Sequence, residues 1–287
     1  MRKIIALIGW IICCTATEKL HAQSFFTGTE YGFGVGGAQY FGDLNDNYGM
    51  KYIRQAGSVF TRIHVNPFIA VRFSANYAHI GYDDKLSSNY YNKKRNLNFQ
   101  SDIIEAAVQA EFNFFRFTTG EDKARFTPYL TGGIGGFYFN PYTKYNGVRY
   151  NLKDIGTEGQ FVGYADRIYS NFNICFPLGV GVKYWLRPGV NLGFEISHRL
   201  TLSDYIDDVS TTYVDRNLFE TNPANPSPAY YLQDRSLEKE GEPLGRPGKQ
   251  RGNSATKDQY MTFMFNISFQ FKTYRCPSWL KGGYFMY

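Results

Sequence analysis

Apolar and polar residues alternate along eight segments of the chain, and this pattern predicts eight β-strands. The clearest segment is QYMTFMFNISFQF at residues 259–271, where every second residue from Met261 to Phe271 is large and apolar. Successive side chains of a strand point to opposite faces, so this segment presents one apolar face. The other alternating segments are residues 31–41, 57–65, 69–77, 104–114, 129–139, 174–184 and 192–200.

The connectors between these segments distinguish a soluble sandwich from a membrane barrel. Those after the second, fourth and sixth segments are short, at 66–67, 115–127 and 187–189. Those after the first, third, fifth and seventh are long, at 42–54, 81–100, 140–170 and 203–258. Strict alternation is typical of outer-membrane barrels with periplasmic turns and external loops. The predicted fold class is therefore all-β, an eight-stranded antiparallel up-and-down transmembrane β-barrel of the outer membrane.

The faces opposite the apolar ones carry charged residues, which predict a filled lumen. An eight-stranded barrel is only wide enough for its interior side chains to fill it. We expect four basic and three acidic residues to form a packed interior charge network and not a pore, namely Arg62, Arg72, Glu105, Glu111, Lys183, Glu195 and Arg199. Aromatic residues near strand ends are expected at the membrane interfaces, as at Tyr40, Phe41, Tyr184 and Trp185.

The N-terminus predicts export. Arg2 and Lys3 precede an apolar run at residues 4–12 that is too short to span a bilayer, and residues 1–22 are predicted to be a signal peptide cleaved after Ala22. Cys13 and Cys14 suggest a lipoprotein, but Ile12 does not fit a lipobox. We expect a barrel over 23–272 in the cell outer membrane and a periplasmic C-terminal tail at 273–287.

The charge balance argues against a nucleic-acid partner. After removal of residues 1–22 the chain has 28 basic and 24 acidic residues, and they are spread along the sequence. A nucleic-acid surface would gather Lys and Arg on one face. The expected environment is outer-membrane lipid.

Few sequence features indicate catalysis, a metal site or a cofactor. His198 lies near Ser203 on the apolar face, which leaves a lipid-modifying enzyme as an alternative, but no third group is in place to orient the histidine. The glycines of GGIGG lie within a predicted strand and do not form a nucleotide loop. We expect no catalytic residue, no metal site, no cofactor and no small-molecule substrate.

An acidic cluster follows the seventh segment and has two interpretations. Asp204, Asp207, Asp208 and Asp215 are hard oxygen ligands at close spacing, as calcium requires. The same carboxylates can instead cap turns and bond to the loop backbone at the barrel rim. Their spacing is not that of an EF-hand loop.

The loop segment TLSDYIDDVSTTYVD at 201–215 resembles the signature of a Bacteroidota family of outer-membrane β-barrels that includes PorG of the type IX secretion system. Four other segments also resemble this family, namely GGAQYFGDLN at 36–45, PYLTGGIGGFYFNP at 128–141, FPLGVGVKYWL at 176–186 and RGNSATKDQY at 251–260. The resemblance covers essentially the whole mature chain. The matched loop residues are Asp204, Tyr205, Asp207, Asp208, Ser210 and Tyr213.

This resemblance implies a non-enzymatic barrel that acts in protein export and contacts periplasmic secretion-ring proteins. Two alternatives stay open, which are a stand-alone structural or adhesive barrel and, with less support, a lipid-modifying outer-membrane enzyme.

Two further segments carry expectations. The tail contains Cys276 and Trp279 and is too apolar to float freely, so we expect it to contact a periplasmic partner or to plug the barrel. Cys175 is expected about 30 Å along its strand from the periplasmic end, too far to pair with Cys276. The Pro- and Gly-rich segments at 222–231 and 241–253 predict a mobile loop with little regular structure.

Overall fold

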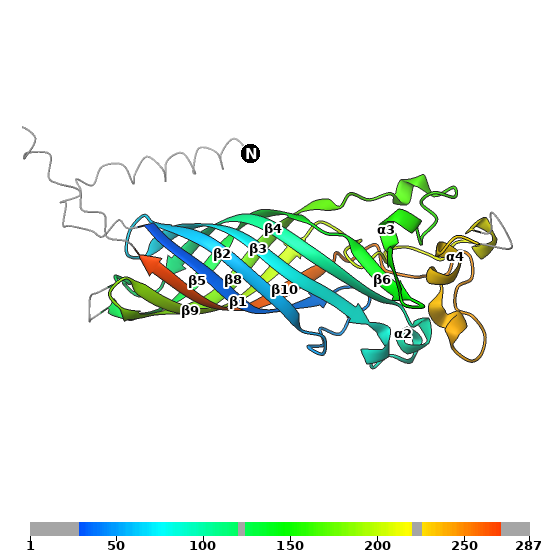
Figure 1. Ribbon diagram of the computed structural model, residues 1–287, viewed down its shortest axis with the longest axis horizontal. Helices are drawn as coiled ribbons and strands as arrows, with labels where there is room; N and C mark the ends of the chain where they lie inside the picture. Colours follow the sequence, from blue (N-terminus) through cyan, green and yellow to red (C-terminus); the bar gives the residue numbers. More distant parts are fainter. Residues whose placement is uncertain (1–28, 120–123, 220–225, 271–287) are drawn as a thin grey trace, which may run out of the picture.

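Eight antiparallel strands close into a barrel in the computed structural model, which describes residues 29–119, 124–219 and 226–270 (Figure 1). Each strand pairs with its neighbours along the chain, and β1 pairs with β10 to complete the circle. This confirms the predicted fold class. The barrel strands are β1 Thr29–Phe41, β2 Arg54–His64, β3 Ile69–Asp83, β4 Asn98–Asn113, β5 Phe126–Tyr138, β8 Phe172–Arg187, β9 Val190–Thr201 and β10 Gln259–Gln270.

Side chains alternate strictly between the two faces of the barrel wall. On β10, Phe265 is 66% exposed, whereas Thr262 and Met264 are buried. On β4, Ile104 is exposed and its neighbour Glu105 is buried. An exterior of exposed apolar groups around a charged interior is stable only where the exterior meets lipid. The protein is an outer-membrane β-barrel.

Three turns lie at one end of the barrel and four loops at the other, although the turn 114–125 is as long as the loop 42–53 and departs from the predicted short-long alternation (Figure 1). The turns are residues 65–68, 114–125 and 188–189, and the loops are 42–53, 84–97, 139–171 and 202–258. Pairing of β3 with β4 continues to Asp83 and Asn98, so the second loop is shorter than the predicted 81–100.

The long loops fold into a cap of short elements. A hairpin, β6 with β7, lengthens the wall because Tyr142 pairs with Gln100 of β4. The cap elements are the strands β6 Pro141–Tyr145 and β7 Val148–Asn151, the α-helices α2 Tyr90–Arg95, α3 Leu152–Ile155 and α4 Ala229–Leu232, and the 3-10 helices η1 Asp84–Leu86, η3 Ala165–Arg167, η4 Arg216–Phe219 and η5 Arg235–Glu238. No helix in the described ranges is long and apolar enough to cross a membrane.

Part of the described fourth loop is packed into the cap, although its composition predicts a mobile loop with little regular structure. Ala229, Leu232 and Ser236 are buried, whereas residues 237–250 and 253–257 lie largely at the surface. Proline and glycine exclude long helices and strands, but irregular backbone can still be buried when its polar groups find partners. Here the Asp234 carboxylate accepts hydrogen bonds from the backbone amides of Ser236 and Gly245.

Three of the four aromatic residues expected at the membrane interface are buried. Tyr184 is 42% exposed, as expected. Tyr40 and Trp185 fall on the inward register, where Trp185 lies beneath the Arg125 guanidinium. Phe41 has the outward register but packs against Tyr48 of the first loop. The predicted signal peptide, the tail with Cys276 and Trp279, and Phe271 lie outside the described residues.

Replacing Phe265 with lysine tests the orientation of the wall. Phe265 lies in the middle of β10 opposite Val35 and Phe194, so the ammonium would enter the hydrocarbon. We expect a loss of about 2–4 kcal/mol in the free energy of unfolding, measured by urea titration in lipid vesicles. The control Tyr90→Lys changes a residue that is 80% exposed on the cap and is expected to change little. Equal effects at both positions would contradict a lipid-facing β10.

Candidate functional site

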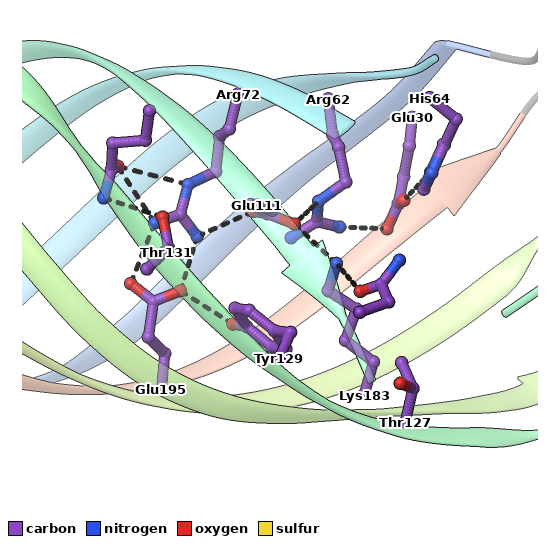
Figure 2. Close-up of polar contacts among 12 residues, drawn as sticks. Glu30, Arg62, His64, Arg72, Glu111, Thr127, Tyr129, Thr131, Lys183 and Glu195 are labelled. Atoms are coloured by element: carbon purple, nitrogen blue, oxygen red, sulfur yellow. Dashed lines mark hydrogen bonds and ion pairs between the residues drawn. The ribbon is translucent and has the colours of Figure 1, made fainter. Parts of the chain in front are cut away.

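The lumen holds a continuous network of buried charges (Figure 2). The structure places all seven residues of the predicted interior network there, each no more than 5% exposed. Ion pairs cross the lumen between strands that are far apart in sequence, such as Arg72 on β3 with Glu195 on β9. The network members from the sequence are Arg62, Arg72, Glu105, Glu111, Lys183, Glu195 and Arg199.

Glu111 on β4 is the centre of this network. Its Oε2 lies 2.7 Å from Arg62 Nε and 2.5 Å from Lys183 Nζ. Its Oε1 lies 3.3 Å from Arg72 Nη1, an ion-pair contact outside hydrogen-bond geometry. Three cations therefore converge on one carboxylate, which compensates for its removal from water.

Arg72 joins Glu111 to a second carboxylate. Its Nη1 and Nη2 donate to the two oxygens of Glu195 at 2.5 and 2.9 Å, in the fork geometry that favours arginine. Tyr129 Oη donates to the same Glu195 at 2.7 Å, and Gln109 Oε1 accepts from Arg72 Nη2 at 2.9 Å. The lumen is thus held together by bidentate and shared contacts and not by isolated pairs.

Glu30 completes the network, although it is not among the residues predicted from the sequence. Its side chain is fully buried, and its oxygens lie 2.6 Å from Arg62 Nη1 and 2.9 Å from His64 Nε2. Asn191 also donates to it at 3.2 Å. The predicted segment begins at residue 31, one position after Glu30, whose side chain shares the inward register of Gly32 and Gly34. With it, four carboxylates balance the four cations from the sequence prediction.

A second charged layer lies nearer the cap. Glu105 Oε2 accepts from Tyr260 Oη at 2.6 Å and from Arg199 Nε at 3.1 Å, and Asn76 donates to Oε1 at 2.6 Å. The cavity beside this layer has a volume of only about 10 Å³. That is about the space of one water molecule. The lumen is a packed polar core at this level.

The loop segment 201–215 lies at the rim, where it joins the cap to the barrel. Asp207 Oδ2 lies 2.6 Å from Tyr40 Oη, and Asp258 Oδ1 lies 2.8 Å from the same oxygen. Asp204 accepts from Ser210 Oγ at 2.5 Å. The end of β1 is therefore joined to both ends of the fourth loop.

Asp208 and Tyr205 bind the third loop. Asp208 accepts from Tyr169 Oη at 2.7 Å and from the Thr157 hydroxyl. The Tyr205 ring stacks on Tyr169 with centroids 4.5 Å apart. Tyr213 is buried and exchanges backbone hydrogen bonds with residues 248 and 249. Tyr205, Asp208 and Ser210 thus join the fourth loop to the third, whereas Asp207 joins it to β1 and Asp204 and Tyr213 hold it together internally.

A buried ion pair that no local sequence pattern predicts anchors the same region. Glu158 of the third loop lies 3.0 Å from Arg251 Nη1 and accepts from the backbone amide of Ser210 at 2.9 Å. Arg251 also donates to the Asp208 carbonyl at 2.6 Å. Separation by 93 residues hides such a pair from any local pattern.

The contacts favour the turn-capping interpretation of the acidic cluster over calcium. Asp204, Asp207 and Asp208 each have protein donors, and Asp215 lies apart, where it caps the Asn217 amide. Within the described ranges no group of three or more His, Cys, Asp or Glu side chains is arranged to hold a metal ion.

Burial sets the electrostatics of the rim. It raises the pKa of Asp207 and Asp258 well above the usual range, and neighbouring carboxylates raise both pKa values further. Burial also raises the pKa of Asp204 and of Asp208 to about 6. The Tyr40 hydroxyl has one proton to donate but contacts two carboxyl groups, so the geometry itself favours a proton on Asp207 or Asp258.

His198 and Ser203 do not form a catalytic pair. His198 Nε2 lies 2.6 Å from Gln259 Oε1, whereas Ser203 Oγ accepts from the Tyr205 amide at 3.3 Å. His198 Nδ1 is buried without a hydrogen-bond partner. Neither side chain orients the other.

The sequence matches a family model described as "Domain of unknown function (DUF6089)" over residues 5–221. The chain belongs to the DUF6089 family. No curated protein matches the sequence.

Several solved outer-membrane proteins are similar to this DUF6089 barrel. The attachment invasion locus protein Ail of Yersinia pestis, in complex with the heparin analogue sucrose octasulfate, is 9% identical, with 85% of this chain and 99% of that chain covered and a TM-score of 0.40. Neisserial surface protein A is 9% identical, with 85% of this chain and 97% of that chain covered and a TM-score of 0.40. OprG from Pseudomonas aeruginosa is 9% identical, with 87% of this chain and 99% of that chain covered and a TM-score of 0.38.

Replacing Arg72 with methionine tests the lumen network. The change leaves Glu195 buried without a cation, and we expect a loss of about 3–5 kcal/mol in the free energy of unfolding. Adding Glu195→Gln should recover part of this loss, because the stranded charge is then removed. Urea unfolding in vesicles measures both. The control Arg246→Ala breaks an exposed pair with Glu242 and should cost at most about 1 kcal/mol.

The rim is expected to weaken as pH rises. Raised carboxyl pKa values mean that the folded rim binds more protons than the unfolded chain, whose aspartates titrate near about 3.9. The stability from these groups is therefore greatest in acid and falls as pH rises through about 6, the pKa of Asp204 and Asp208. Hydrogen exchange of residues 203–214, corrected for intrinsic rates, measures it. Asp204→Asn should flatten the pH dependence near pH 6, whereas Asp215→Asn should keep it. Identical profiles for both variants would refute this assignment.

Proposed function

We propose that the protein is a non-enzymatic outer-membrane barrel that acts as a component or anchor of a protein-export machinery of the type IX kind. The proposal rests on the resemblance of five segments, including the loop segment at 201–215, to the family that includes PorG. The filled lumen supports it, because the Glu111 network occupies the space that a pore would need. A barrel with a packed interior acts through its surfaces.

The periplasmic surface is the proposed contact with secretion-ring proteins. In this proposal Cys276 and Trp279 of the C-terminal segment form the contact, with the thiol available for a mixed disulfide. The barrel then serves to hold that segment at the outer membrane.

The folded cap favours a second candidate, a stand-alone structural or adhesive barrel. Loops that interact through the buried Glu158–Arg251 pair and the Tyr169–Tyr205 stack present a defined external surface. In that case the external loops, and not the periplasmic end, would carry the function.

Co-purification distinguishes the two candidates. The full-length protein is extracted from native membranes in mild detergent, and bound proteins are identified by mass spectrometry. We expect periplasmic ring proteins with the intact chain and their loss when residues 273–287 are removed. The control Arg246→Ala alters only an exposed pair of the cap and should retain the ring proteins.

Two outcomes argue against the export role or its covalent form. Recovery of solitary barrels from the intact chain would favour the structural or adhesive candidate. Non-reducing electrophoresis that shows no shifted band dependent on Cys276, compared with Cys276→Ser, would exclude the mixed disulfide.

A further inference from the structure

An apolar groove of about 770 Å³ lies on the lipid-facing wall of the barrel. Its floor is a row of small cross-strand partners, Ala75 on β3, Ala106 on β4 and Gly136 on β5. The next row toward the turns is large, with Phe73, Val108 and Ile134 in register. A small row beside a large row leaves a channel in the wall that bulk side chains do not fill.

A polar cluster lies on the same face and the same strands, on the cap side of the groove. Asp102 Oδ1 lies 2.7 Å from His79 Nδ1 and accepts from Tyr77 Oη at 2.7 Å. Tyr77 follows Ala75 by two residues, and Asp102 precedes Ala106 by four. At about 3.3 Å per residue, the cluster begins about 7 Å from the groove floor and extends to about 13 Å.

Two cations extend this cluster onto the β6–β7 hairpin. Lys144 and Arg149 are exposed and directly opposite in the antiparallel register, so their side chains share one face. The Arg149 guanidinium lies 3.6 Å from the centroid of the Tyr142 ring, whose hydroxyl donates to Gln100 of β4 at 2.9 Å. Like charges in directly opposite positions destabilise a strand pair unless an anion lies between them.

We propose that this wall binds one lipid of the outer leaflet, with an acyl chain in the groove and a phosphate-bearing headgroup on Lys144, Arg149 and His79. The apolar groove and the polar cluster follow each other in the order in which a lipid presents its chain and its headgroup. Two exposed cations supply the charge that a phosphate requires.

The histidine is oriented for this role. Because its Nδ1 faces the Asp102 carboxylate, that nitrogen carries a proton, and Nε2 points away from Asp102. Nε2 is therefore the ring nitrogen that is open to the lipid headgroup. This site is independent of the proposed export role, and either can fail without the other.

Lipid titration of the full-length protein in detergent tests the site. The delipidated protein is titrated with diphosphorylated lipid A, and bound lipid is counted by native mass spectrometry. We expect one saturable adduct, weakened at least about fivefold by Ala106→Phe, which fills the groove floor. The matched control Ala110→Phe changes an exposed alanine of β4 outside the groove and should bind like the wild type.

The headgroup contacts are tested by Lys144→Ala and Arg149→Ala. We expect each to weaken binding of diphosphorylated lipid A about fivefold and to leave binding of its dephosphorylated form unchanged. Arg246→Ala, which removes an exposed cap cation elsewhere, should alter neither. A heat-dependent gel shift verifies that each variant is folded. Equal binding by Ala106→Phe and Ala110→Phe, or an unchanged phosphate preference without Lys144 and Arg149, would overturn the proposal.

Discussion

Backbone amides cannot remain unpaired in hydrocarbon, and the rest of this structure depends on that constraint. The β1–β10 ladder, from Glu30–Gln270 to Phe41–Gln259, satisfies it by removing the last open edge. Closure with eight strands then leaves a narrow lumen that side chains must fill. Because successive side chains alternate, every apolar residue that faces lipid brings a neighbour that faces this lumen.

The charged lumen follows from closure and has its own energetic condition. Buried ions are tolerated only when each has close partners, and Glu111, Glu195 and Glu30 meet this condition through cations from β2, β3 and β8. Those cations cross the barrel and therefore also fix the position of opposite walls. The polar interior sets which strands face one another across the lumen, while the backbone ladder sets which are adjacent.

The same periodicity explains what the sequence could and could not predict. A period of two is local, so the strands, their faces and the inward position of Arg72 or Glu195 could be predicted from neighbours alone. Which cation pairs with which carboxylate could not, because Arg72 and Glu195 are 123 residues apart. Tyr40 shows the limit most clearly. Its aromatic ring at a strand end suggested a membrane interface, but its even position on β1 turns it inward to Asp207 and Asp258.

The cap is held together by side-chain contacts and the barrel by backbone hydrogen bonds, so the two parts differ in how they tolerate sequence changes. Its loops lack a ladder and are joined by side-chain contacts such as Asp207–Tyr40 and Glu158–Arg251, whose strength depends on protonation and burial. The barrel wall, by contrast, is fixed by backbone bonds that side-chain changes do not remove. Small residues such as Ala75 and Ala106 can therefore be placed on the wall without loss of the fold. A closed barrel with a filled lumen can vary its outer wall and its loops, and binding surfaces can arise on both.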